Sequence, residues 1–187
     1  SRLQQSGYQG LFTINLSGQT IANESLIDDI EALIVNSAVD PNKVIFEITE
    51  TSAVSNLVSA NELIIRLNEL GCRFALDDFG SGFSSFSHLK NLPVDFVKID
   101  GLFVRGVAAD SSDQAIVQSI NDIAHSLGKK TIAEYVESAE TLQYLYESGV
   151  DFVQGHFVSP PLDASLIDSL TNLENYTPEI TDNIVGV

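Results

Sequence analysis

Short apolar runs alternate with amphipathic segments of helical period along most of the chain. Six runs rich in Val, Ile and Phe lie at residues 11–15, 44–48, 73–76, 94–99, 130–133 and 150–153. Segments with one apolar helical face follow them, at residues 21–35, 53–70, 84–90, 112–127, 139–148 and 162–170. Strands that alternate with helices are typical of a parallel sheet with helices packed outside it. The sequence therefore predicts an α/β fold.

A polar residue stands at or just past the end of every predicted strand. These residues are Asn15, Glu47, Asp77, Lys98, Glu134 and Gln154. An open doubly wound sheet would gather its ligand residues at one crevice, whereas a barrel carries them in a ring at the carboxyl ends of its strands. Neither GxGxxG nor GxxxxGK[ST] occurs in the chain. We therefore expect a (β/α)8 TIM-like barrel.

The length bears on how much of such a barrel is present. A complete barrel takes about 250 residues, or about 200 at the small end, and this chain has 187. The six predicted strands are therefore two short of a closed barrel of eight. We assign residues 1–170 to this incomplete barrel and residues 171–187, which show no sustained period, to a C-terminal tail.

No segment of the sequence predicts export or insertion into a membrane. The chain contains no run of the ~20 apolar residues that a membrane-spanning helix needs, and its first residues lack the apolar core of a signal peptide. We expect a cytoplasmic domain, in a full-length protein that an N-terminal region outside this chain can tether to the inner membrane.

The charge balance restricts the ligands. Asp and Glu number 26 against 9 Lys and Arg, which gives a net charge of −17. Such a surface repels polyphosphate, so we expect no DNA or RNA polymer as a partner. An anionic ligand would need positive charge from another source, and a bound divalent metal supplies it.

The polar strand ends offer oxygen ligands of the kind that Mg²⁺ and Mn²⁺ prefer. Asn15, Glu47 and the adjacent pair Asp77 and Asp78 are all of this type. Two metals about 3.5–4 Å apart clamp an in-line phosphoryl displacement. Any one of these residues alone has an ordinary explanation as a turn, a cap or a solvated side chain. Their recurrence at the end of every predicted strand favours a metal site.

Three further residues are candidates to assist the reaction. Lys98 can position the attacking water or stabilise developing charge. Glu134 and Asp100 can complete the surroundings of the second metal or orient that water.

The order of these motifs resembles that of the EAL domain, a family of bacterial phosphodiesterases for the second messenger cyclic di-GMP. The motifs are Asn15-Leu16-Ser17, Phe46-Glu47-Ile48-Thr49-Glu50-Thr51, Asp77-Asp78-Phe79-Gly80, Lys98-Ile99-Asp100, Glu134-Tyr135-Val136-Glu137 and Gln154-Gly155. The likeness runs from about residue 10 to residue 162. Any one motif is weak, but six in the same order are specific.

The resemblance implies hydrolysis of cyclic di-GMP to linear pGpG with two Mg²⁺ or Mn²⁺ ions, and inhibition by Ca²⁺. By motif match, Asn15, Glu47 and Asp77 would hold the first metal, and Asp77 and Asp78 the second. It also implies an upstream sensory or GGDEF domain in the full-length protein.

The same resemblance assigns supporting roles. Lys98 would contact the catalytic water, while Glu134 and Gln154 would support the second metal and the water. Glu50 would anchor the Asp-Asp-Phe-Gly loop, at which this family often forms homodimers, so we expect a homodimer through that region. Asp100 would be a carboxylate just outside the metal ligands.

Two features depart from the family pattern. The Glu-Ala-Leu strand that names the family, and supplies a metal ligand, should precede Asn15, and nothing equivalent does. The resemblance therefore implies that the first two strands of the barrel are missing from this chain. We attribute Glu31-Ala32-Leu33 to coincidence, because it lies on a predicted helix, and we expect the isolated chain to be poorly active. The second departure is Tyr135, which replaces a glycine. Tyr135 can crowd the site, stack on a guanine or weaken turnover, and we count it with Ser17 among the ligand-binding candidates.

Three functions remain open from the sequence. The first is a cyclic di-GMP phosphodiesterase. The second is a catalytically weak or inactive EAL domain that binds cyclic di-GMP as a receptor, for which the missing ligand and Tyr135 would be the reason. The third is a dimerisation scaffold, which the retained acidic ring disfavours because repelling carboxylates are costly to keep without cations.

Overall fold

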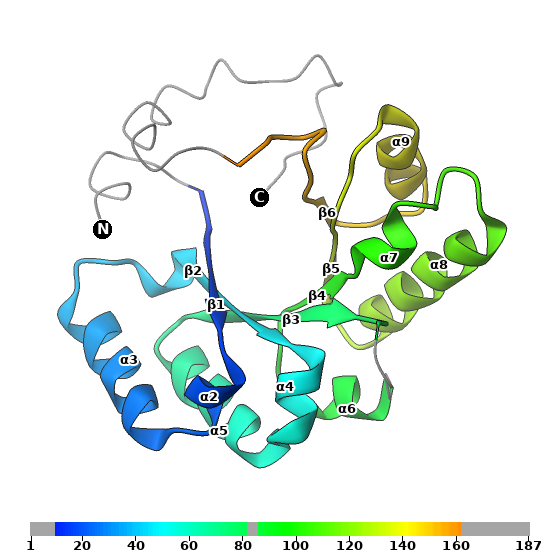
Figure 1. The fold of residues 1–187 in the computed structure, drawn as a ribbon. Coiled ribbons are helices and arrows are strands. Elements are labelled where there is room, and N and C mark those ends of the chain that lie inside the picture. The colour runs from blue at the N-terminus through cyan, green and yellow to red at the C-terminus, as the bar shows by residue number, and fades with distance from the viewer. Residues whose placement is uncertain (1–9, 82–85, 162–187) are drawn as a thin grey trace.

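The computed structural model describes residues 10–81 and 86–161, and within them six strands form one parallel sheet (Figure 1). In sheet order the strands are β1 (Phe12–Leu16), β2 (Val44–Thr49), β3 (Arg73–Phe79), β4 (Phe96–Ile99), β5 (Lys130–Ala133) and β6 (Phe152–Val153). The sheet curls as part of a barrel does, and the helices cover its outer side (Figure 1). The predicted α/β fold and all six predicted strands are confirmed.

The helices follow the predicted alternation with some differences in their bounds. They are α2 (Gly18–Ile21), α3 (Glu24–Asn36), α4 (Glu50–Ser55), α5 (Leu57–Glu69), α6 (Phe86–Asn91), α7 (Gly101–Val104), α8 (Ser111–Ser126) and α9 (Ala139–Glu147), with a 3-10 turn at Pro41–Lys43. The predicted helix at 162–170 and the predicted tail lie outside the described residues. Among the described residues no helix is both long and apolar enough to cross a bilayer.

The first predicted helix begins at residue 24 and not at 21, and the second is divided. Asn23 precedes α3, and its side chain caps that helix by accepting a hydrogen bond from the Ser25 backbone N–H at 3.1 Å. Asn56 separates α4 from α5 in the second. Helix α7 was not predicted, because it has only four residues and no amphipathic period.

Two apolar layers lie on the two sides of the sheet. The larger one packs the outer side of the strands against the helices and includes Phe46, Phe74, Leu76, Val97 and Ile99. The smaller one, inside the curl, is made of Ile45, Ala75, Phe96 and Ile132. Successive residues of a strand point to opposite sides, so the two sets alternate along each strand.

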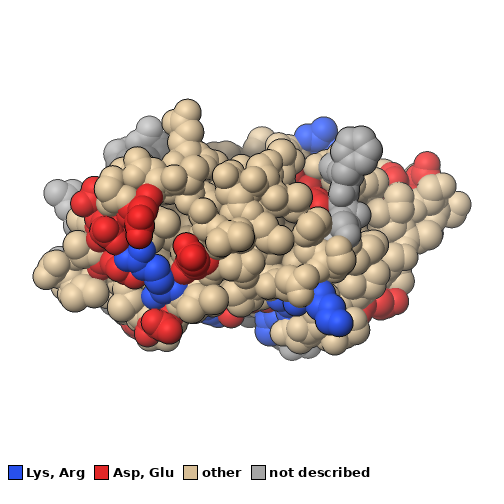
Figure 2. Space-filling view, turned by 90° about the horizontal axis from the view of Figure 1, so that it is seen from below, with Lys and Arg blue, Asp and Glu red and all other residues tan. Residues whose placement is uncertain are grey.

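The outer surface reflects the net charge. Seen from below, acidic side chains gather toward the α3 side of the molecule, around a smaller number of basic ones (Figure 2). Arg66 on α5 pairs there with Asp28 and Glu31 on α3, both at 2.6 Å. Glu31 therefore holds two helices together on the outside of the barrel. This position supports the interpretation of Glu31-Ala32-Leu33 as a coincidence.

A buried lysine links the connection before β4 to the start of β5 through hydrogen bonds. The Lys129 ammonium donates to the backbone carbonyls of Leu92 and Val94 at 2.8 and 2.9 Å. The Lys129 side chain is buried, and loss of solvation of its charged form lowers the pKa of Lys129.

Hydrogen bonds to Asp151, at the opposite end of the strands from the polar residues, join α8 to β5 and the start of β6. One oxygen of Asp151 accepts a hydrogen bond from the Thr131 backbone N–H at 2.9 Å and lies 2.7 Å from Nε2 of His125. Burial alone would raise the pKa of Asp151, but the hydrogen bonds from Thr131 and His125 outweigh it and lower that pKa.

We expect the free energy of unfolding of Asp151→Asn to change less with pH below neutrality than that of the native chain. Because the folded state lowers this pKa, the carboxylate stabilises the fold above its unfolded pKa, about 3.9, and that contribution is lost as the pH falls through the folded value. Urea unfolding at about pH 7, 5 and 3 should show a less stable variant at neutral pH with a smaller loss on acidification. Asp29→Asn on exposed α3 is the control, and equal acid slopes for native chain and Asp151→Asn would contradict the prediction.

Candidate active site

A layer of charged residues lies directly above the inner apolar layer. Each member stands two residues beyond an inner apolar residue on the same strand, and two residues along a strand return to the same side. The pairs are Ile45 and Glu47 on β2, Ala75 and Asp77 on β3, Phe96 and Lys98 on β4, and Ile132 and Glu134 just after β5. With Asp78, the four charged residues of this layer form what we call the charged cluster.

Lys98 is the centre of the charged cluster. Its ammonium nitrogen lies 2.9 Å from Glu47, 3.0 Å from Asp77 and 2.8 Å from Glu134, and its side chain is only 3% exposed. Carboxylates from β2, β3 and the segment after β5 thus meet at the Lys98 ammonium nitrogen on β4. The sequence placed these side chains on one face, but it did not predict that Glu47 and Glu134 are buried.

A β-bulge brings the second aspartate to the same side as the first. Between two ladder pairs, β3 runs from Leu76 to Phe79 while β4 runs only from Val97 to Ile99, so β3 carries one extra residue. Asp78 takes up this extra residue with a left-handed φ of 56°. Aspartate tolerates that region better than most residues do.

The bulge also corrects one expectation from the sequence. Residues 77–82 were predicted to form a loop after a strand ending at Leu76, whereas β3 continues to Phe79. Phe79 is buried, and Asp77 pairs in register with Thr49 on β2. The strand therefore persists through the two aspartates, and the bulge holds them more rigidly than a loop would.

The carboxylates of the cluster differ in how readily they ionise. Burial raises the pKa of Glu134; contact with Lys98 opposes this shift, and the charges of Asp77 and Glu47 add to it. Burial also raises the pKa of Asp78, and the nearby charges of Asp77 and Asp100 add to that shift. For Lys98, burial alone would lower the pKa, but hydrogen bonds to Glu134 and Glu47 outweigh it and raise the pKa. The cluster therefore carries more negative charge than one ammonium balances.

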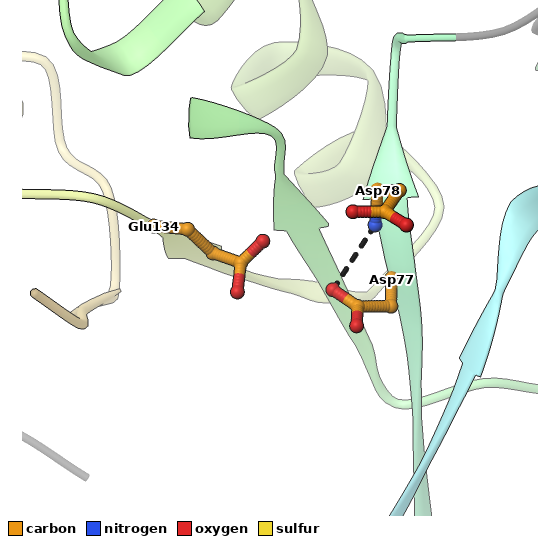
Figure 3. Close-up of side chains that lie close together, drawn as sticks. All are labelled: Asp77, Asp78 and Glu134. Atoms are coloured by element: carbon orange, nitrogen blue, oxygen red, sulfur yellow. Dashed lines mark hydrogen bonds between the residues drawn. The ribbon is translucent and has the colours of Figure 1, made fainter. Parts of the chain in front are cut away.

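The donor set fits a hard divalent cation. One carboxylate oxygen from each of Asp77, Asp78 and Glu134 lies within 4.8 Å of the others (Figure 3). Asp77 also accepts a hydrogen bond from the Asp78 backbone N–H at 3.0 Å, which fixes the two aspartates relative to each other (Figure 3). Oxygen-only donors of this kind suit Mg²⁺ and Mn²⁺. A cation here would also relieve the repulsion that raises the pKa values of Asp78 and Glu134.

The remaining predicted site residues lie at the same end of the sheet in different roles. Asn15 on β1 pairs in register with Glu47, so it stands on the same side of the sheet as the cluster. Ser17 caps α2, with its hydroxyl accepting from the Thr20 backbone N–H at 3.2 Å. Asp100 caps α7 by accepting from the Leu102 backbone N–H at 2.8 Å.

Glu50 lies beneath the turn that follows β3. It is the first residue of α4 and is buried, at 6% exposure. One of its carboxylate oxygens lies 3.5 Å from the Gly80 backbone N–H. This contact joins the start of α4 to the turn after β3.

Tyr135 occupies a backbone position that favours glycine. Its φ is 55°, a strained value for a bulky residue. The ring lies against Gly101, where any side chain would overlap it, and the Arg105 guanidinium stands 4.2 Å above the ring centroid. The sequence did not single out Arg105, because the contact joins residues from different elements and leaves no local pattern.

A cavity of about 400 Å³ opens beside the charged cluster. Its lining includes Glu134, Tyr135, Gln154, Gly155 and His156. Glu134 therefore belongs both to the charged cluster and to the lining of the cavity. Gln154 is exposed, and its backbone carbonyl accepts from the Val136 N–H at 3.1 Å.

Comparison with known proteins identifies the family. The sequence model of the EAL domain matches residues 1–161. "Cyclic di-GMP phosphodiesterase PdeB" of Shewanella oneidensis is 42% identical over 149 residues, which is 80% of this chain and 17% of that protein. "Cyclic di-GMP phosphodiesterase PdeF" of Escherichia coli K12 is 36% identical over 163 residues, 87% of this chain and 22% of that protein. The chain thus spans about a fifth of the length of these curated relatives.

Solved structures agree with this assignment. "PaMucR Phosphodiesterase, c-di-GMP complex" superposes with a TM-score of 0.82 at 31% identity, covering 89% of this chain and 68% of that one. The EAL domain of Mycobacterium smegmatis DcpA gives a TM-score of 0.87 at 28% identity, covering 95% and 80%. The curled sheet, the charged cluster at its carboxyl end and these matches lead to one conclusion: the chain belongs to the EAL domain family.

Proposed function

We propose that this chain is part of a metal-dependent phosphodiesterase that hydrolyses cyclic di-GMP to linear pGpG in the cytoplasm. The observation that carries the proposal is the convergence of Glu47, Asp77 and Glu134 on Lys98 at 2.8–3.0 Å, with Asp78 beside them and a cavity sharing Glu134. The relatives named as cyclic di-GMP phosphodiesterases and the neighbour solved with c-di-GMP support the same substrate.

The reaction adds one water across one phosphodiester bond of the ring. A new phosphorus–oxygen bond forms, the bond from phosphorus to one ribose 3′ oxygen breaks, and the water proton ends on that oxygen. Two Mg²⁺ or Mn²⁺ ions, held by Asn15, Glu47, Asp77 and Asp78, would supply Lewis acidity. Lys98 orients the attacking water, and Glu134 with Gln154 would support the second metal and that water. Asp100 and Ser17, both helix caps, hold the rim of the site in place.

Tyr135 lines the cavity, where a base of the ligand would lie. Arg105 covers one face of the Tyr135 ring, so a guanine stacks on that pair only through the remaining exposed surface, which is 50% of the residue. Glu50 keeps the turn after β3 in position. We place the homodimer contact at that turn and a sensory or GGDEF domain upstream in the full-length protein.

The test is product formation by the natural full-length protein. With Mg²⁺ or Mn²⁺ we expect conversion of cyclic di-GMP to pGpG, detected by ion-exchange chromatography. We expect complete loss with a chelator, and with Ca²⁺ retained binding but no turnover. Calorimetric binding of cyclic di-GMP without any pGpG in Mg²⁺ or Mn²⁺ would instead establish the receptor, and absence of both would contradict either function.

A further inference from the structure

The charged cluster contains a cation of its own. The Lys98 ammonium donates a hydrogen bond to Glu47 at 2.9 Å and forms ion pairs with Asp77 at 3.0 Å and Glu134 at 2.8 Å. Three carboxylates therefore hold its positive charge within the cluster.

Lys98 and a metal would use the same ligands. Of the three carboxylates that lie within 4.8 Å of one another, Asp77 and Glu134 both contact Lys98. Only Asp78 of that group has no ion pair with Lys98 among the described contacts. A divalent ion on Asp77 and Glu134 would therefore meet a positive charge bound to the same two groups.

We propose that Lys98 acts as the internal counter-ion of the metal-free site, competes with divalent metals for Asp77 and Glu134, and is released toward the substrate side only when a metal takes its place. This inference rests on the proposed metal-dependent function. Lys98 would then change partners with metal occupancy, from the carboxylates of the cluster to the attacking water.

A competing lysine and a supporting lysine predict opposite effects of removing Lys98 on metal affinity. If Lys98 only kept the carboxylates in place, its loss would weaken metal binding. If it competes, its loss strengthens metal binding, because a unit positive charge beside a divalent ion repels it strongly enough to change affinity about tenfold or more.

The experiment compares Mn²⁺ affinity in four forms of the chain, measured by electron paramagnetic resonance of free Mn²⁺. Lys98→Gln removes the charge but keeps hydrogen-bond donors, and we expect it to bind Mn²⁺ at least about tenfold more tightly than the native chain. Lys98→Arg keeps the charge and should stay within about threefold of native. Lys129→Gln is the matched control, since Lys129 is also buried but contacts the carbonyls of Leu92 and Val94, and its affinity should not change.

A second measurement needs no variant, and so remains decisive if Lys98→Gln does not fold. Nitrogen-15 spectra of lysine side chains should show the Lys98 ammonium protected from solvent exchange in the metal-free chain, and losing that protection when Mg²⁺ is added. Unchanged or weaker Mn²⁺ binding by folded Lys98→Gln, or a Lys98 signal indifferent to Mg²⁺, would overturn the inference. Because neither readout uses hydrolysis, either result leaves pGpG formation by the native protein as a separate test of the proposed function.

Discussion

Asp78→Gly should strongly reduce hydrolysis of cyclic di-GMP while leaving the fold as stable as before or more stable. Asp78 sits at the bulge with a φ of 56°, which glycine adopts without strain. Its carboxylate also faces the like charges of Asp77 and Asp100, and together with burial they raise the Asp78 pKa. Removing the side chain therefore relieves both strain and repulsion, and we expect a gain of about 1 kcal/mol in the metal-free chain.

The loss of activity has a separate cause. A carboxylate that helps to hold a catalytic metal contributes several kcal/mol to the transition state, so we expect the rate of pGpG formation to fall by about 10²–10⁴-fold. Thermal unfolding and product formation should be measured on the same natural full-length protein. Asp78→Asn, which also tolerates a positive φ, is the control for backbone effects and should lose comparable activity. A stable Asp78→Gly protein with near-native turnover would remove Asp78 from the site.

The strands and their polar ends could be predicted because the signals are local. Runs such as Val44–Ile48 combine β-branched and aromatic residues, and a polar residue that ends such a run lies at the carboxyl edge of a parallel sheet. The sequence also holds a finer signal. Ile45, Phe96 and Ile132 each precede a charged residue by two positions, which places that residue on the inner side, above an apolar layer.

Other features depend on contacts that no local pattern records. The Asp-Asp-Phe-Gly segment has the composition of a turn, and only the pairing of Phe79 with Ile99 continues β3 through it as a bulge. The burial of Lys98 follows from three carboxylates meeting it from other parts of the sheet. The stacking of Arg105 on Tyr135 joins a short helix to the segment after β5. Such features arise from the closure of the sheet, which periodicity does not describe.

Gly155→Ala should be among the most damaging single substitutions outside the charged cluster. Gly155 follows β6, and a Cβ atom on it would overlap the backbone nitrogen, carbonyl carbon and oxygen of Val136. Both backbone polar groups of Val136 are hydrogen-bonded. Its N–H donates to the Gln154 carbonyl at 3.1 Å, and its carbonyl accepts from the Phe157 N–H at 3.0 Å. Backbone atoms cannot turn aside as a side chain can, so the segment must move and lose these hydrogen bonds. We expect the free energy of unfolding to fall by about 3 kcal/mol.

A second glycine separates this steric cause from backbone strain. Gly128 has a φ of 71°, and a Cβ atom added to it would meet nothing within 4 Å, so Gly128→Ala costs only the conformational penalty, about 1 kcal/mol. Urea unfolding of both variants should rank Gly155→Ala as clearly the worse, and equal losses would contradict the close-approach argument. Because Gly155 and Gln154 line the cavity beside Glu134, folded Gly155→Ala protein should also bind cyclic di-GMP more weakly, whereas Gly128→Ala should bind it as the native protein does. The close packing of Gly155 against the Val136 backbone thus determines both the shape of the cavity and the stability of this edge of the sheet.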